Sequence, residues 1–399
     1  MTTVAPISIG VVGGGAPATV DAVGTVTPAD AAWTCEWWIG GDDRWHVPAN
    51  EVAVRQHRVR DVAVVETTMR VPGGDAVQRV YAAAEPGRPL VIEVENQSPA
   101  PFVLAFALRG PSTVIADGTQ VMIDKVFVLT TLRAPSRWAR SVASPVLVPV
   151  TTGLAETGPF PGTRDRSARL EVAFLHPVAH RTTFRAVLTR GTEVPRFDVR
   201  GPPDAAAVAR GWSRVLERGM QVQLPDRPIE ARIRAARAEI LLRGQSRNPG
   251  ALVAAALEDW GFDAEAETAW RHLGARERRR AGTRPEPTSW TDAMTIDDDA
   301  AFLLGVRRLL VHDDARDPSR PVALCAEFPV AWRGQPVEVR DAPVAGGAVS
   351  YAVRWHGARP ALLWDAPEGV AVRMPGLDPT WTSGPATGEA LLGPADSAA

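Results

Sequence analysis

Short runs of apolar or alternating residues fill the first 200 positions of the chain. Residues 89–96 alternate apolar with acidic side chains, and residues 102–109 follow after a turn rich in proline. Runs of this kind, separated by Gly, Pro and Asn, are typical of an antiparallel sandwich rather than of βαβ units. The pattern therefore predicts a large β-sandwich, with further strands at residues 61–71, 126–131, 169–175 and 182–189.

The pattern changes after residues 200–203, where Arg-Gly-Pro-Pro ends the strands and acts as a linker. A helical period follows: Ile229, Ile233 and Ile240 recur at the spacing of one helix face. Residues 276–287 look like a charged connection broken by prolines. The periodic segments predict five helices, at about residues 204–217, 226–244, 248–261, 263–274 and 298–312.

Strand-like sequence returns after residue 318, where residues 347–357 and 359–365 resemble a strand–turn–strand pair. The expected fold class is therefore α+β, mainly β. We expect three parts: a large N-terminal antiparallel β-sandwich at 1–200, a short α-helical hairpin domain at 201–318, and a small C-terminal β unit with a tail at 319–399.

Composition narrows the class of protein. The 399 residues carry a net charge of -2 and 45% hydrophobic residues, which is ordinary for a globular protein. This balance gives no reason to expect a nucleic acid or a membrane as partner. The N-terminus lacks the pattern of a signal peptide and no apolar run is long enough to span a bilayer, so we expect a cytoplasmic protein. The two cysteines, Cys35 and Cys325, leave open whether they pair.

Tryptophan is unusually frequent, with 13 residues against 2 tyrosines. Trp packs in cores but also stacks on sugar rings. Glycoside hydrolysis needs two carboxyl groups that flank the scissile bond. The acids nearest to tryptophans in the helical part are therefore the candidate catalytic residues: Glu258 and Asp259 beside Trp260, and Asp292 beside Trp290. The competing interpretation is that these acids lie on solvent-facing helix surfaces, where acids are common.

A second mixture of polar and aromatic residues follows a run of apolar positions near residue 40. We consider it a candidate substrate-binding loop, together with Trp260 and Trp290; its residues are Trp38, Asp42, Asp43, Arg44 and Trp45. The alternative is a β-turn at Gly40 and Gly41 with the Trp side chains in the core, because large aromatic residues are mostly buried.

Two apparent motifs predict no ligand. His176 and His180 have the spacing of a helical metal pair, but Pro177 lies in a strand-like context. The glycine-rich segment 10–15 is not followed by a helix, as a dinucleotide site requires. We therefore expect neither a metal nor an organic cofactor.

The order of sandwich, helices and small β unit is similar to that of six-hairpin, (α/α)-toroid glycosidases and glycoside phosphorylases. The local resemblance lies in a helix–Gly–helix hairpin made by Ala256, Leu257, Gly261, Glu265 and Ala266. Residues 37–46 and 351–364 also look like segments of actinobacterial proteins with this layout. Five helices make this a shortened helical domain.

The resemblance implies a carbohydrate-active, glycosidase-like protein that acts on or binds a glycan through a Trp-lined surface with acidic residues. The alternative that we keep open is a non-catalytic subunit that binds a glycan or a protein partner, or that forms a homo-oligomer.

Overall fold

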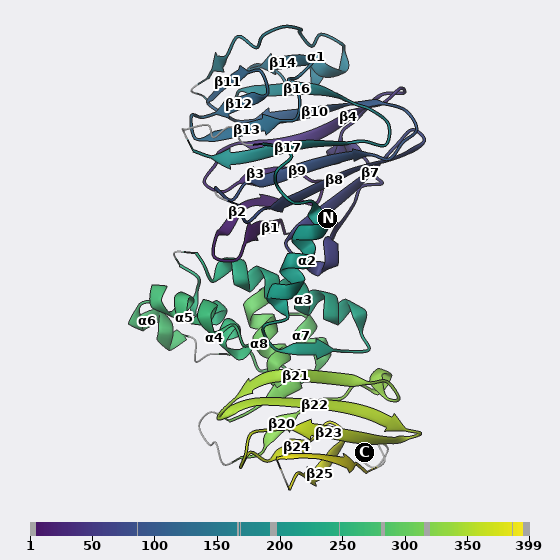
Figure 1. The fold of residues 1–399 in the computed structure, drawn as a ribbon, viewed down its shortest axis with the longest axis vertical. Helices are drawn as coiled ribbons and strands as arrows, with labels where there is room; N and C mark the ends of the chain where they lie inside the picture. Colours follow the sequence, from purple (N-terminus) through teal and green to yellow (C-terminus); the bar gives the residue numbers. More distant parts are fainter. Residues whose placement is uncertain are drawn as a thin grey trace. The chain divides into compact units, whose positions relative to one another are not determined.

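The computed structural model describes residues 5–85, 87–165, 167, 169–191, 198–246, 248–280, 284–314, 320–384 and 386–393. The chain forms two compact units, residues 1–211 and 212–399, whose elements are labelled in Figure 1. The boundary expected at residue 318 and residues 394–399 of the expected tail lie outside the described residues.

The first unit contains a nine-stranded antiparallel sheet with the order β15-β11-β12-β13-β17-β9-β8-β7-β6. Its strands β9, β8 and β7 are consecutive neighbours, whereas β17 comes from much later in the chain. In sheet order, the strands are Thr163–Arg164, Thr113–Asp117, Gln120–Ile123, Phe127–Thr131, Thr183–Arg190, Leu90–Asn96, Gly74–Ala82, Val64–Val71 and Arg55–Arg58.

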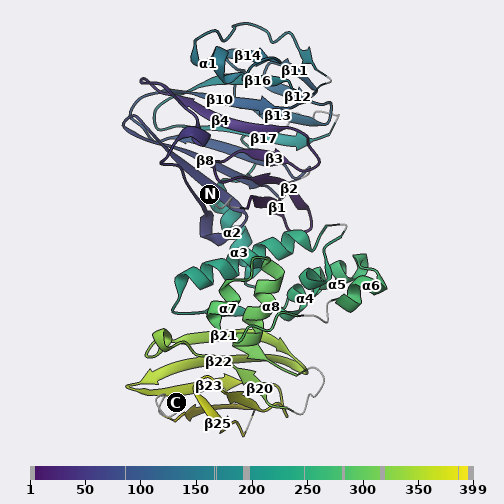
Figure 2. The ribbon, with the colours of Figure 1, turned by 180° about the vertical axis from the view of Figure 1, so that it is seen from behind.

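An eight-stranded sheet forms the other layer of this unit, with the order β1-β2-β3-β4-β10-β16-β14 and β5 paired to β4. Figure 2 shows both layers from behind. In that order, its strands are Ile7–Val11, Gly15–Val20, Val26–Pro28, Thr34–Gly40, Phe102–Arg109, Glu171–Val178, Arg137–Ser141 and, for β5, Trp45–His46.

The main core lies between the two sheets, because each strand turns alternate side chains inward. In β10, Leu104, Phe106 and Leu108 belong to this core, together with residues of the nine-stranded sheet. Ala105 and Ala107 point to the opposite face and join a second, smaller core. The expected sandwich is therefore present, with side chains on both faces of its central strands buried.

The second core is covered by the short helix α1 (Leu147–Thr151). Val146 and Val150 pack there with Trp38, whose side chain is fully buried. This cover explains why β10 is apolar on both of its faces.

The helices of the chain follow the expected order. α2, α3, α4, α5 and α8 correspond to the five expected helices; α6 lies in the segment expected to be a connection, and α7 was not expected. Ser289 caps α7 by accepting a hydrogen bond from the Asp292 amide. The bounds are Ala205–Leu216, Arg227–Arg243, Ala251–Asp259, Asp263–His272, Ala275–Arg280, Trp290–Met294 and Asp299–Leu310 for α2 to α8, with 3-10 turns at Pro48–Asn50, Val59–Asp61 and Val330–Trp332.

The second unit also contains two small sheets, with the orders β18-β21-β22-β23-β26 and β19-β20-β24-β25. The pairing of β20 with β24 is parallel, whereas the other strand pairs of these sheets are antiparallel across the described residues. The strands are Gln221–Gln223, Val337–Val344, Gly347–His356, Arg359–Asp365 and Thr387–Leu391 in the first sheet, and Val311–His312, Val322–Leu324, Val372–Met374 and Asp378–Thr382 in the second.

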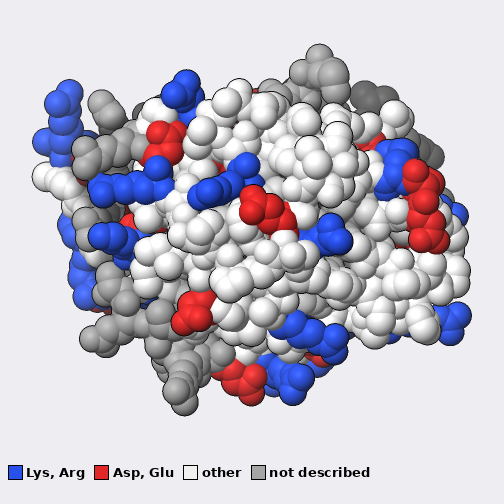
Figure 3. Space-filling model, turned by 90° about the horizontal axis from the view of Figure 1, so that it is seen from above, with Lys and Arg blue, Asp and Glu red and all other residues white. Residues whose placement is uncertain are grey.

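The structure confirms the α+β, mainly β fold class. Both cysteines are buried free thiols, and burial raises the pKa of each to about 12. Among the described residues, no helix is long and apolar enough to cross a membrane. The face of the molecule in Figure 3 mixes acidic and basic side chains among other residues, in keeping with the low net charge.

The N-terminal cap of α3 allows a first prediction. The Asp226 side chain accepts a hydrogen bond from the Ile229 amide at 3.1 Å. Because an uncapped amide loses its partner, Asp226→Ala should lower the free energy of unfolding by about 1 kcal/mol. Asp226→Asn keeps the acceptor and should cost much less. Urea titrations of both variants check this, and equal losses would show that the cap does not matter.

Candidate binding site on the nine-stranded sheet

A row of charged side chains crosses the outer face of the nine-stranded sheet. Glu66 lies opposite Arg79, Arg79 opposite Glu93, and Glu93 opposite Arg185, on four successive strands. His57 extends the row to β6, opposite Glu66. Opposite charges at directly opposed positions stabilise antiparallel pairs, so the register of four strand pairs brings these residues into one line.

Ion pairs hold the middle of this row in place. The Arg79 Nε lies 2.6 Å from Glu66 Oε2, and its Nη1 lies 2.7 Å from Oε2 of Glu95. The Arg185 guanidinium donates to Oε1 of Glu93, whose side chain is only 6% exposed. Each guanidinium therefore has a fixed orientation before any ligand arrives.

Tyr81 forms a hydrogen bond with the charged row through Glu93. Its hydroxyl lies 2.8 Å from Glu93 Oε1 and 2.9 Å from the Pro203 carbonyl oxygen, and it can donate its one proton to either. Burial raises the pKa of Tyr81 well above its ordinary value, and the neighbouring Glu93 adds to that shift. The phenol therefore stays neutral and acts as a hydrogen-bond donor.

The segment that leads into α2 forms one wall of the site. Arg185 Nη1 donates to the Pro202 carbonyl oxygen at 2.9 Å, which ties this segment to the sheet. Asp204 accepts a hydrogen bond from the Ala207 amide at 2.6 Å and so caps α2. The segment Arg-Gly-Pro-Pro therefore lies across the charged row, where its Pro202 and Pro203 carbonyl oxygens accept hydrogen bonds from Arg185 and Tyr81.

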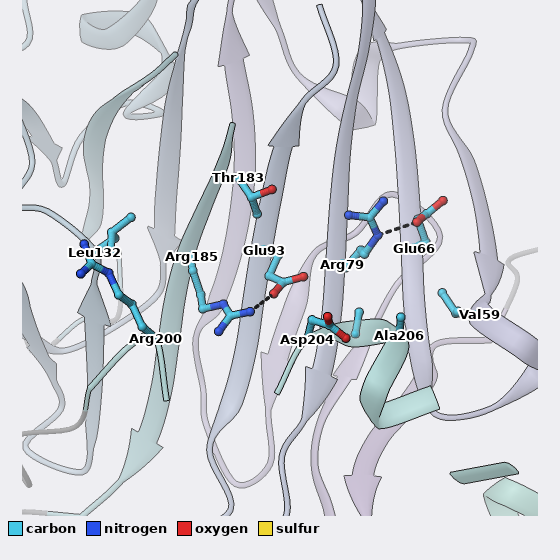
Figure 4. A pocket seen from close by; sticks show the side chains of 11 residues that line it. Val59, Glu66, Arg79, Glu93, Leu132, Thr183, Arg185, Arg200, Asp204 and Ala206 are labelled. Atoms are coloured by element: carbon cyan, nitrogen blue, oxygen red, sulfur yellow. Dashed lines mark hydrogen bonds and ion pairs between the residues drawn. The ribbon is translucent and has the colours of Figure 1, made fainter. Parts of the chain in front are cut away.

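The row and this wall enclose a pocket of about 660 Å³. This volume falls within the roughly 300–1,000 Å³ that is usual for small-molecule sites. Figure 4 shows Arg200 and Leu132 at one end of the pocket and Glu66 and Val59 at the other. The lining residues are Val59, Glu66, Arg79, Glu93, Leu132, Thr183, Arg185, Arg200, Asp204, Ala205 and Ala206.

The acids expected to be catalytic lie elsewhere, in the second unit. Glu258 is exposed and accepts a hydrogen bond from Trp270 Nε1 at 3.1 Å. Asp259 is 20% exposed and pairs with Arg284; burial raises the pKa of this carboxyl, while the arginine opposes that shift. Trp260 is fully buried and donates to the Leu303 carbonyl oxygen. Its indole face therefore supports the core.

Asp292 does not join them. Its carboxylate accepts a hydrogen bond from the Thr288 hydroxyl at 2.7 Å, and hydrogen bonds from Thr288 and Ser289 lower its pKa. Trp290 is 4% exposed and packs against Trp332. The small pocket that Asp259 lines, about 60 Å³, is lined by neither Glu258 nor Asp292.

The expected binding loop near residue 40 is held by its own contacts. Trp38 is buried, and Trp45 is half-buried. Asp43 and Arg44 are engaged with neighbours: Asp43 Oδ1 lies 3.0 Å from the buried His46 Nε2, and Arg44 forms a double hydrogen bond with Glu51. Asp42 is exposed in the turn. These contacts agree with the β-turn and core interpretation of this stretch.

The sequence pattern did not predict the charged row. The one available signal was the alternation of acidic and apolar residues in 89–96, which places Glu93 and Glu95 on one face of a strand. Which strands lie beside it, and in which register, depends on pairing between distant segments, and Arg185 lies 92 positions from Glu93.

Comparison with known proteins gives no family. No protein-family model matches the chain, and no curated protein sequence matches it significantly. Across the part of the chain that the structure describes, no group of three or more His, Cys, Asp or Glu residues could hold a metal ion.

Proposed function

We propose that the protein is carbohydrate-active and that the pocket on the nine-stranded sheet binds a glycan. The observation that carries this proposal is the charged row of Glu66, Arg79, Glu93 and Arg185 along the pocket floor. Each sugar hydroxyl both donates and accepts a hydrogen bond. A row that alternates acceptors and donors is therefore matched to a chain of such hydroxyls.

The side chains of the charged row are already oriented and keep free hydrogen-bonding positions for a ligand. A carboxylate has about four acceptor positions and a guanidinium has five N–H donors, so the ion pairs leave capacity for a ligand. The Arg79 contacts, for example, use Nε and Nη1. Because these side chains are already fixed, a ligand does not have to immobilise them, which reduces the entropic cost of binding.

The proposed mode of binding differs from a Trp-lined surface. None of the residues that line the pocket is aromatic. All 13 tryptophans are buried or half-buried. The proposed glycan is therefore held by hydrogen bonds along the charged row, with Leu132 and Val59 as the larger apolar contacts.

Glycoside hydrolysis is a second candidate function. Glu66 and Glu93 share the pocket and are separated by one strand, which puts their Cα atoms about 10 Å apart. Inverting glycosidases hold their two carboxyl groups roughly 6.5–9.5 Å apart. Binding without turnover is favoured, because each carboxylate accepts from an arginine, whereas one acid of such a pair must carry a proton.

A relation to six-hairpin glycosidases stays part of this proposal. The order of β-sandwich, helices and a further β part supports it, together with the α4–α5 hairpin around Gly261. A protein partner or a second copy remains the alternative for the helical part.

Replacing Arg79 with glutamine tests the proposal. The variant removes the donor shared by Glu66 and Glu95, so glycan affinity should fall about tenfold or more, equivalent to about 1.4 kcal/mol. Arg70→Gln is the matched control, because Arg70 lies on the neighbouring strand β7, pairs with Asp75 of β8 and does not line the pocket. A glycan array identifies ligands, and calorimetry compares the variants.

Two results would count against glycan binding at this pocket. Either the wild type binds no glycan on the array, or Arg79→Gln binds as tightly as Arg70→Gln. Incubating each array ligand with the wild type and with Glu66→Gln separates the two functions. Turnover that is lost in the variant selects hydrolysis, and binding without turnover selects the non-catalytic protein.

A further inference from the structure

Arg200 is the arginine of the pocket that has no carboxylate partner among the described residues. Its side chain is exposed and lines the pocket beside Leu132 (Figure 4). Within the described part of the chain, the only hydrogen bond found for Arg200 is that of its backbone amide with Asp198. In this described part, its guanidinium lines the pocket and pairs with no carboxylate.

The other charges of the pocket are already committed. Arg79 is shared between Glu66 and Glu95, and Arg185 pairs with Glu93. The carboxylate of Asp204 accepts from the first turn of α2, where it offsets the positive end of the helix dipole. Three acids and three arginines line the pocket, so its lining has no net charge, and Arg200 at one end is the arginine without a carboxylate partner among the described residues.

We propose that the glycan bound in this pocket is acidic and that Arg200 binds its carboxylate, as in a uronic acid. This inference rests on the proposed glycan-binding function. Two parallel N–H groups of a guanidinium match the two oxygens of a carboxylate, and charge-assisted bonds of this kind are stronger than neutral ones. The hydroxyls of the same sugar lie along the charged row, while its carboxylate meets the end at Leu132.

Because Arg200 is exposed, its contribution to the affinity for an acidic glycan should be moderate. An exposed ion pair is weakened by water and by salt, so Arg200 should add selectivity without dominating the affinity. We expect the acidic glycan to bind about tenfold more tightly than its neutral counterpart at low salt. The preference should shrink as salt is added, because screening acts on the ion pair.

The test uses the full chain and two ligands that differ in one group: an oligouronate and the same oligosaccharide with its carboxyl groups reduced to alcohols. Calorimetry compares the wild type, Arg200→Gln and Arg133→Gln. Arg133 is the matched control, because it is an exposed arginine next to Leu132 that does not line the pocket. Arg200→Lys keeps the charge but loses the paired N–H groups.

Arg200→Gln should weaken binding of the oligouronate about tenfold and leave binding of the reduced oligosaccharide unchanged. The affinity of Arg200→Lys for the oligouronate should lie between those of the wild type and Arg200→Gln. Arg133→Gln should bind both ligands as tightly as the wild type. A wild type that binds both ligands equally would overturn the acidic ligand and leave glycan binding intact. If the wild type binds neither ligand, the acidic ligand is overturned, whereas glycan binding is overturned only if the wild type also binds nothing on the glycan array. Equal effects of Arg200→Gln and Arg133→Gln would refute the contact with Arg200.

Discussion

Replacing Gly24 with alanine should destabilise the first unit by about 3 kcal/mol or more, since backbone strain of roughly 1–2 kcal/mol adds to overpacking of roughly 1–3 kcal/mol. Gly24 is buried in a turn and has a φ of +86°. A Cβ atom there would lie 2.3 Å from Gln78 Oε1 and 2.6 Å from Trp37 Nε1. Neither neighbour can move freely, because both side chains are buried between the sheets.

Gly13→Ala is the control that separates the two contributions. Gly13 has a φ of +76°, and a Cβ atom there would meet nothing within 4 Å. It should therefore show the backbone strain alone, about 1 kcal/mol. Urea titrations of both variants, followed by tryptophan fluorescence, measure the difference. Equal losses of stability would show that the contacts with Gln78 and Trp37 relax at little cost.

Acidification should destabilise the first unit through His176. This side chain is 1% exposed, and its ring lies 4.6 Å from that of Phe184 and 6.1 Å from that of Phe106. Burial lowers the pKa of His176 from 6.5 to about 4. The folded protein therefore holds the neutral imidazole, while the unfolded chain takes up a proton below pH 6.5.

The sign of the effect follows from this difference. Between pH 6.5 and about 4 the unfolded state binds more protons than the folded state, so stability falls as the pH falls through this window. The gap between the two pKa values corresponds to about 3 kcal/mol. The loss is complete below about pH 4, where both states are protonated at this residue.

His176→Leu should remove this part of the pH dependence. Carboxylates also contribute to acid unfolding, so the quantity to compare is the difference in unfolding free energy between wild type and variant at pH 7, 5 and 4. His356→Leu is the control, because His356 is exposed at the end of β22. Parallel curves for the wild type and His176→Leu would show that the imidazole is not held neutral.

The local elements of this fold were predictable from the sequence. The stripe of Ile229, Ile233 and Ile240 and the acid at Asp226 predicted α3 almost to its ends, because helical hydrogen bonds and caps join residues only three or four positions apart. The alternation in residues 89–96 predicted β9 in the same way. The short helix α7 was missed, because its five residues carry too little periodicity.

The candidate site was not predictable in the same way. The acids predicted to be catalytic are neighbours of tryptophans in the sequence, such as Asp259 beside Trp260. Adjacent helix residues point about 100° apart, and here Trp260 turns into the core while Asp259 turns to Arg284. Sequence proximity therefore gave no information about which aromatic ring an acid would meet.

By itself, the sequence determined the fold class, the positions of five helices and of eight strands such as β9 and β10, and the change of pattern at residues 200–203 that precedes the helices. Tertiary structure alone decided that Glu66, Arg79, Glu93 and Arg185 stand in one row and that Arg200 faces the same pocket. The physical reason is the distance along the sequence over which each kind of interaction acts. Periodicity and caps act within a few residues, whereas a binding site on a sheet depends on the neighbours and register of strands that are distant in the chain.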